Sequence, residues 1–112
     1  MDASALANAL KALGDTRRLQ MAQEIAAAGE LSCGQVHELF ELSQPTISHH
    51  LRILADAGVL TVREAGQHRF ISINQRVIRE LAVLLPARLT PRRRRGTARA
   101  TSSRKAKRAG AQ

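Results

Sequence analysis

The sequence predicts a small, mainly α-helical fold with one β-hairpin, and three observations predict it. Apolar residues recur at helical spacing in five segments of the 112-residue chain. A β-rich stretch at residues 59–73 has Gly66 at its centre, where a hairpin tip needs a positive φ. Aromatic residues make up only 2% of the chain, so Leu, Ile, Val, Ala and Met must form the core. A chain of this length forms one ordinary domain.

The first two helices are predicted from apolar stripes and end signals. Residues 4–13 carry a stripe that Gly14 ends, and Asp15 is the expected N-cap of the next helix. That second helix presents its own apolar face and stops at Gly29. Two consecutive helices separated by one short turn are therefore expected.

The third and fourth helices are predicted to be joined by a tight turn. Ser32 caps a short third helix, and the turn covers residues 41–43. Ser43 then caps the fourth helix, and Pro45 falls in its first turn, where a missing N–H costs nothing. Gly58 closes this helix.

The hairpin and a last helix, residues 75–86, complete the predicted order: four helices, hairpin, helix. Two helices joined by a tight turn and followed by a hairpin form a winged helix-turn-helix. We expect residues 1–86 to form this DNA-binding and dimerisation domain. Residues 87–112 are expected to be a disordered basic tail, because they hold one large apolar residue, Leu89.

The charge and cysteine content limit the function classes. Residues 1–86 hold eight bases and nine acids, a net charge of −1, whereas residues 87–112 hold ten bases and no acid, a net charge of +10. A single cysteine excludes an intrachain disulfide. Neither a membrane span nor a secretory signal is visible, so we expect a cytoplasmic protein without a membrane partner.

The fourth helix, within "LSQPTISHHLRIL", has an unusual outer face. No acid occurs from Leu42 to Ala55. In a helix-turn-helix the second helix enters the major groove, where short polar side chains bind base edges. The expected DNA contacts are Ser43, Gln44, Thr46, Ser48, His49 and Arg52. The alternative is an ordinary polar surface. His50 lies about 100° from its neighbour and falls on the apolar stripe, so it is expected to pack.

The hairpin carries a second set of candidate contacts. Around Gly66 lie four polar or basic side chains that a wing could place against DNA: Arg63, Gln67, His68 and Arg69. The alternative is a solvated tip whose charges keep the edge strand from pairing.

The chain resembles the ArsR/SmtB-type repressors. The residues that carry the likeness are "LGDTRRLQMAQEIAAAGELS", "LSQPTISHHLRILADAGVL" and "REAGQHRFISIN", and together they span about residues 5–85. The resemblance implies a homodimer joined through its first and last helices. It also implies repression by operator occupancy, released by an inducer that is often a metal ion or metalloid. Leu6, Leu10, Leu13, Ile78, Leu81 and Leu85 are the apolar residues we expect a second copy to cover.

The metal sites of that family do not carry over. Arsenic- and cadmium-type members have a Cys-Val-Cys pattern where this chain has Ser32-Cys33-Gly34. Zinc- and cobalt-type members use Asp and His on the last helix, where this chain offers Glu80 alone. We therefore expect no metal site, no cofactor and an unidentified inducer. Cys33 is either a thiol sensor at a helix start or a small residue filling a helix junction.

The sequence also bears on two other function classes. A sequence-tolerant architectural protein would rely on the basic tail instead of base-reading residues. An enzyme is not expected, because the sequence has no nucleophile–base–acid set, no glycine-rich phosphate loop and no paired carboxylates.

Overall fold

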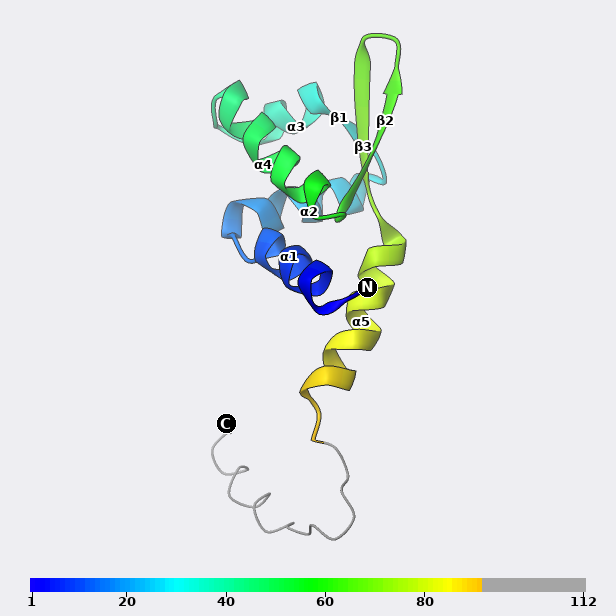
Figure 1. Ribbon diagram of the computed structural model, residues 1–112. Helices are drawn as coiled ribbons and strands as arrows, with labels where there is room; N and C mark the ends of the chain where they lie inside the picture. The colour runs from blue at the N-terminus through cyan, green and yellow to red at the C-terminus, as the bar shows by residue number, and fades with distance from the viewer. Residues whose placement is uncertain (92–112) are drawn as a thin grey trace, which may run out of the picture.

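The structure, a computed structural model, describes residues 1–91 and contains five helices and three strands (Figure 1). In chain order they are α1 (Ala3–Leu13), α2 (Thr16–Ala28), β1 (Leu31–Ser32), α3 (Cys33–Leu39), α4 (Gln44–Asp56), β2 (Leu60–Ala65), β3 (His68–Ile73) and α5 (Gln75–Leu89). The predicted order of helices and hairpin is confirmed. The short strand β1 was not predicted.

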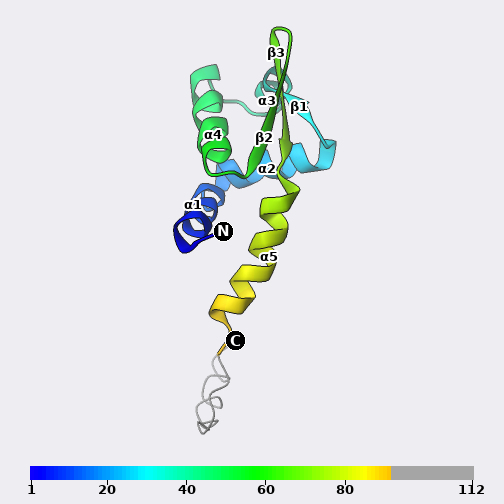
Figure 2. The same ribbon diagram turned by 45° about the vertical axis from the view of Figure 1, so that its right-hand side comes forward.

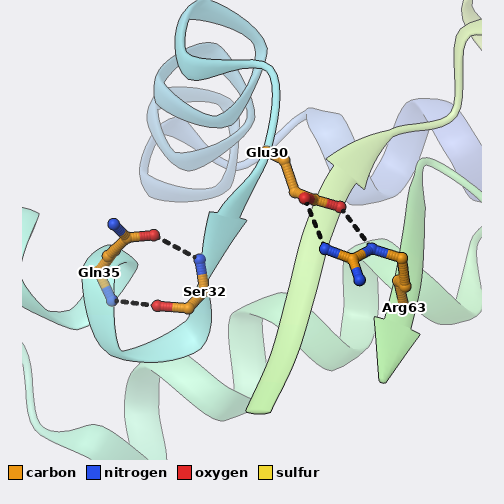
Figure 3. Close-up of polar contacts among 4 residues, drawn as sticks. All are labelled: Glu30, Ser32, Gln35 and Arg63. Atoms are coloured by element: carbon orange, nitrogen blue, oxygen red, sulfur yellow. Dashed lines mark hydrogen bonds and ion pairs between the residues drawn. The ribbon is translucent and has the colours of Figure 1, made fainter. Parts of the chain in front are cut away.

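The predicted N-caps form as the sequence indicates. The Asp15 carboxylate accepts hydrogen bonds from the backbone N–H groups of Arg17 and Arg18, at 2.9 and 3.1 Å. The Arg18 N–H in particular lowers the pKa of Asp15. At α3 the side chains of Ser32 and Gln35 each accept from the other residue's backbone N–H, which gives a capping box (Figure 3). These bonds fix where each helix starts.

The three strands form one antiparallel sheet in the order β1-β3-β2. The two-residue loop Gly66-Gln67 joins β2 to β3, and Gly66 has a φ of 63°, as a tight hairpin requires. β1 pairs Leu31 with Ile71, so it connects the start of α3 to the hairpin. The hairpin projects beyond the helices as a wing (Figure 1).

The core lies where α1, α2, α3 and α4 meet the root of the sheet. Its largest fully buried side chains come from four of these elements and the segment after α4: Met21, Ile25, Val36, Ile47, Leu54, Val59 and Ile71. Leu51 of α4 joins them, so α4 is held by its whole apolar stripe. This anchoring leaves the opposite face of α4 in solvent.

Two expectations about α1 and α5 were wrong. Leu6 and Leu81 were expected to need a second copy of the chain, but they are only 6% and 7% exposed because this chain's own core covers them. The large apolar side chains exposed on these two helices are Leu10 of α1 together with Val83 and Leu89 of α5, the last two at 66% and 76%. Figure 2 shows why: most of α5 extends away from the other helices.

The last helix also ends later than predicted. α5 continues through Pro86 to Leu89, so the predicted boundary at residue 86 falls inside the helix. Proline removes one helical hydrogen bond but has a helical φ, and the Thr90 N–H still bonds to the Pro86 carbonyl at 3.0 Å. Residues 87–89 are therefore helical instead of disordered. Residues 92–112 of the predicted tail lie outside the described residues.

Candidate nucleic-acid interface

α4 is held so that one end and one face remain free. Ser43 caps its N-terminus: the Ser43 hydroxyl oxygen accepts from the Thr46 backbone N–H at 3.3 Å and lies 2.9 Å from the Thr46 hydroxyl. Pro45 occupies the first turn, as predicted. The start of α4 is therefore capped without any side chain from another element.

The outer face of α4 carries the side chains predicted to read DNA. Gln44, Ser48, His49 and Arg52 are exposed, while Thr46 is half-buried. Ile47, Leu51 and Leu54 point the other way, into the core. Within residues 1–91 none of the four exposed side chains has a hydrogen bond or ion pair to another protein side chain. Their polar groups are thus available to a ligand.

The two adjacent histidines differ as the sequence predicted. His49 is exposed, whereas His50 is half-buried, and their ring centroids are 6.0 Å apart. His50 Nδ1 lies 3.5 Å from Arg18 Nη1 on α2. Burial lowers the pKa of His50, with the nearby Asp15 carboxylate acting in the opposite direction. The neutral ring is therefore favoured at this position.

Arg63 of the wing is already engaged within the protein. Its guanidinium donates two hydrogen bonds to the Glu30 carboxylate, at 2.9 and 3.1 Å (Figure 3). It also lies 4.7 Å from the centre of the Phe70 ring. The ion pair lowers the pKa of Glu30 and raises that of Arg63. Arg63 thus joins the wing to the segment that follows α2.

The remaining wing candidates lie at or near the tip. Arg69 faces Glu64 across the hairpin at 3.6 Å, and both side chains are more than half exposed. Gln67 and His68 are exposed beside Gly66. The tip therefore offers the Arg69 guanidinium, loosely paired, and the polar side chains of Gln67 and His68.

Cys33 lies at the first position of α3 and is half-buried against the core. In the part of the chain that the structure describes, no group of three His, Cys, Asp or Glu side chains could hold a metal ion. The described helices also include none long and apolar enough to cross a membrane.

Known proteins of similar sequence support this interpretation of the fold. A helix-turn-helix domain family matches residues 13–63, from the end of α1 into β2. The transcriptional repressor SdpR of Bacillus subtilis (strain 168) is 34% identical over 73 residues, which cover 65% of this chain and 80% of SdpR. The arsenical resistance operon repressor of Staphylococcus aureus is 33% identical over 76 residues, covering 68% of this chain and 72% of that one.

The chain belongs to the ArsR family of transcriptional regulators. It is a DNA-binding regulator and not an enzyme. A homodimeric winged helix-turn-helix DNA-binding domain from Mycobacterium bovis has the same fold, with a TM-score of 0.63 at 23% identity over 84% of this chain and 89% of that one. The winged helix-turn-helix architecture predicted for this ArsR-family chain is thus confirmed.

The sequence patterns do not indicate two residues of the interface region, Arg18 and Glu30. Arg18 contacts His50 from 32 positions away, and Glu30 pairs with Arg63 from 33 positions away. Neither contact has a local sequence signal, because both depend on how α2 packs against α4 and the sheet. The nearest sequence signal to Arg18 is the N-cap residue Asp15, and that residue indicates only where a helix starts.

Proposed function

We propose that this ArsR-family chain is a homodimeric repressor that occupies an inverted-repeat operator in the cytoplasm and leaves it when a signal binds. The observation that carries the proposal is that the two faces of α4 differ. Its inner apolar face is buried in the core, while the side chains of Gln44, Ser48, His49 and Arg52 have no hydrogen-bond or ion-pair partner among residues 1–91. A rigid helix with free hydrogen-bonding groups suits direct reading of base edges in the major groove.

The dimer is supported by the exposed apolar side chains of α1 and α5. Leu10, Val83 and Leu89 are large and lie on the two helices that a second copy would cover. Apolar area removed from water contributes about 25 cal/mol per Å². A two-fold dimer reads two half-sites about one helical turn apart, so its operator is an inverted repeat.

The wing and the C-terminal segment are proposed to add affinity without reading sequence. Arg69 at the tip, with Gln67 and His68, is proposed to contact the sugar-phosphate backbone. The ten bases of residues 87–112 suit the same role, since each neutralised phosphate adds about 0.9 to the magnitude of the salt slope. Metal ions are not proposed as the signal, because residues 1–91 gather no three-ligand group.

Selection from a random duplex pool with the full-length protein tests this function. We expect enriched sequences to share an inverted repeat, and unselected duplex to compete poorly. A pool without a common motif would favour the architectural alternative and contradict the repressor. Truncation after Pro91 should lower affinity for both duplexes alike and reduce the salt slope; an unchanged slope would show that the C-terminal segment does not bind phosphate.

The dimer has its own test by sedimentation at micromolar concentration. Val83→Glu should give monomers, because it places a charge in the proposed interface. Leu19→Glu, at an exposed apolar position on α2, is the matched control and should remain dimeric. Wild-type protein that sediments as a monomer would overturn the dimer.

A further inference from the structure

A cleft of about 390 Å³ lies between α1, the start of α2 and the last turn of α4. Ala12, Ile53 and Ala57 give it apolar walls. It lies at the C-terminal end of α4, whereas the groove-reading side chains lie toward the N-terminal end. Its size falls within the usual range of small-molecule sites.

Two of the four polar side chains that line the cleft are basic, which gives it a net positive charge. Lys11 and Arg18 both line it, against one carboxylate, Asp56, and the amide of Asn8. An anion would therefore meet two cations, and its apolar part would meet the alanine and isoleucine walls. Guanidinium groups bind carboxylates through two parallel hydrogen bonds.

Arg18 connects this cleft to the recognition helix. Its Nε donates to the Ala12 carbonyl oxygen at 2.7 Å, near the end of α1. Its Nη1 lies 3.5 Å from His50 Nδ1 on α4. Because arginine has donors only, this contact needs a lone pair on Nδ1, which the neutral ring supplies when its proton is on Nε2. One side chain therefore bridges α1, α2 and α4.

We propose that this cleft is the effector site and that it binds a small organic carboxylate with an apolar body. The carboxylate bonds to the Lys11 ammonium and the Arg18 guanidinium, and the body lies against Ile53 and its apolar neighbours. This assignment rests on the proposed repressor function, for which it supplies the place where the signal acts.

The same contacts explain how the ligand changes DNA binding. A carboxylate that engages the Arg18 guanidinium draws Nη1 away from His50, which loosens the connection between α2 and α4. The recognition helix is then less firmly held in its groove-reading position. Coupling between two sites in one protein commonly changes affinity 5- to 150-fold, and we expect the lower part of that range.

Binding is tested on the full-length protein without DNA, using indole-3-acetate and its uncharged amide as a pair of equal shape. Backbone amide NMR shifts should change in the second half of α1, the first turn of α2 and the last turn of α4. The acid should bind at least tenfold more tightly than the amide. Equal binding of the two probes, or shifts confined to the basic residues 92–112, would overturn the site.

Variants locate the binding groups. Lys11→Ala should weaken acid binding about tenfold, whereas Arg17→Ala, which removes a neighbouring exposed cation that does not line the cleft, should leave it within twofold. Equal losses in both variants would mean general attraction to positive charge and would contradict the proposal.

Coupling is read as the ratio of operator affinities without and with saturating acid. The ratio should be at least five in the wild type. It should be similar in His50→Asn, because the asparagine oxygen keeps an acceptor near the position of Nδ1, and it should be near one in His50→Leu. A ratio that is unchanged in His50→Leu would overturn the coupling through Arg18. If no operator is found, the repressor function fails, while the NMR titration still decides the cleft.

Discussion

The outer face of α4 and the wing both carry polar and basic side chains, but they differ in what those side chains do within the protein. On α4, Gln44, Ser48 and Arg52 have no side-chain partner among residues 1–91. On the wing, Arg63 is held by Glu30 and Phe70, and Arg69 faces Glu64. The number of basic residues in a segment therefore does not give the number available to DNA.

The difference assigns separate tasks to the two regions. α4 is capped, and its inner face is buried in the core. The free hydrogen-bonding groups on its outer face can pair with base edges without first breaking a protein contact. A guanidinium already bonded to a carboxylate must exchange one partner for another, so its net gain on binding phosphate is small. We expect specificity to reside in α4 and the wing to contribute orientation and general affinity.

The largest effect is expected from Gln44→Ala. Loss of a base contact should cost about 1–3 kcal/mol in operator affinity and leave random-duplex affinity nearly unchanged. Gln23→Ala, at an exposed position of α2, is the control. Titration of the operator and of a random duplex measures both affinities, and equal losses on the two would contradict the placement of α4. Thr46→Ala should act similarly, although it also removes a contact with Ser43.

The next largest effect is expected on the free energy of unfolding, to which the N-cap of α4 contributes. Ser43→Ala removes the N-cap and should lower the free energy of unfolding by about 1 kcal/mol, measured by urea denaturation. Ser48→Ala removes a hydroxyl from the exposed middle of the helix and should change stability by less than about 0.5 kcal/mol. If the two variants are equally stable, the Ser43 cap does not secure the helix start.

Within the wing, the two arginines should respond differently to removal. Arg69→Ala should reduce the magnitude of the salt slope of DNA binding by up to about 0.9, because one phosphate contact is lost. Arg63→Ala should leave the slope unchanged, since Glu30 already holds that guanidinium. Affinity measured over a salt series decides this. Equal slopes in the two variants, both below wild type, would mean that Arg63 leaves Glu30 when DNA binds.

The smallest effect is expected from pH acting on His50. Its pKa in the folded protein lies below the ordinary 6.5, because burial, Arg18, His49 and Arg17 outweigh Asp15. The unfolded chain therefore binds the proton first as pH falls, so the stability contributed by neutral His50 is complete above pH 6.5 and is lost as pH falls through the folded value. Urea denaturation at pH 7.5 and 5.0 should show a smaller decrease in His50→Asn than in wild type. The same decrease in both would assign the loss to other groups.

Local signals predicted most of the fold. Asp15, Ser32 and Ser43 are capping residues followed by apolar stripes, and Gly66 lies between two β-rich runs, so helix starts and the hairpin could be placed from residues close in sequence. β1 could not, because two residues carry no periodicity and this strand exists only through pairing with Phe70 and Ile71.

The candidate site was predictable in its composition but not in its contacts. The acid-free, polar face of α4 indicated which side chains to expect there. The pairs Arg63–Glu30 and Arg18–His50 join segments more than thirty residues apart, and no spacing in the sequence indicates them. For the same reason, Leu6 and Leu81 were assigned to a partner surface although the chain's own tertiary packing buries them.

The two-residue strand β1 has a consequence for how the molecule comes apart. Because β1 bonds to Phe70 and Ile71, the middle of β3 is paired on both sides, whereas the tip beside Gly66 is paired only within the hairpin. We therefore expect amide hydrogens near the tip to exchange through local opening, and those of Phe70 and Ile71 to exchange more slowly. The wing therefore has two parts of different expected stability: a tip that is free to adjust to a DNA backbone, and a doubly paired middle that is joined to the core through Ile71.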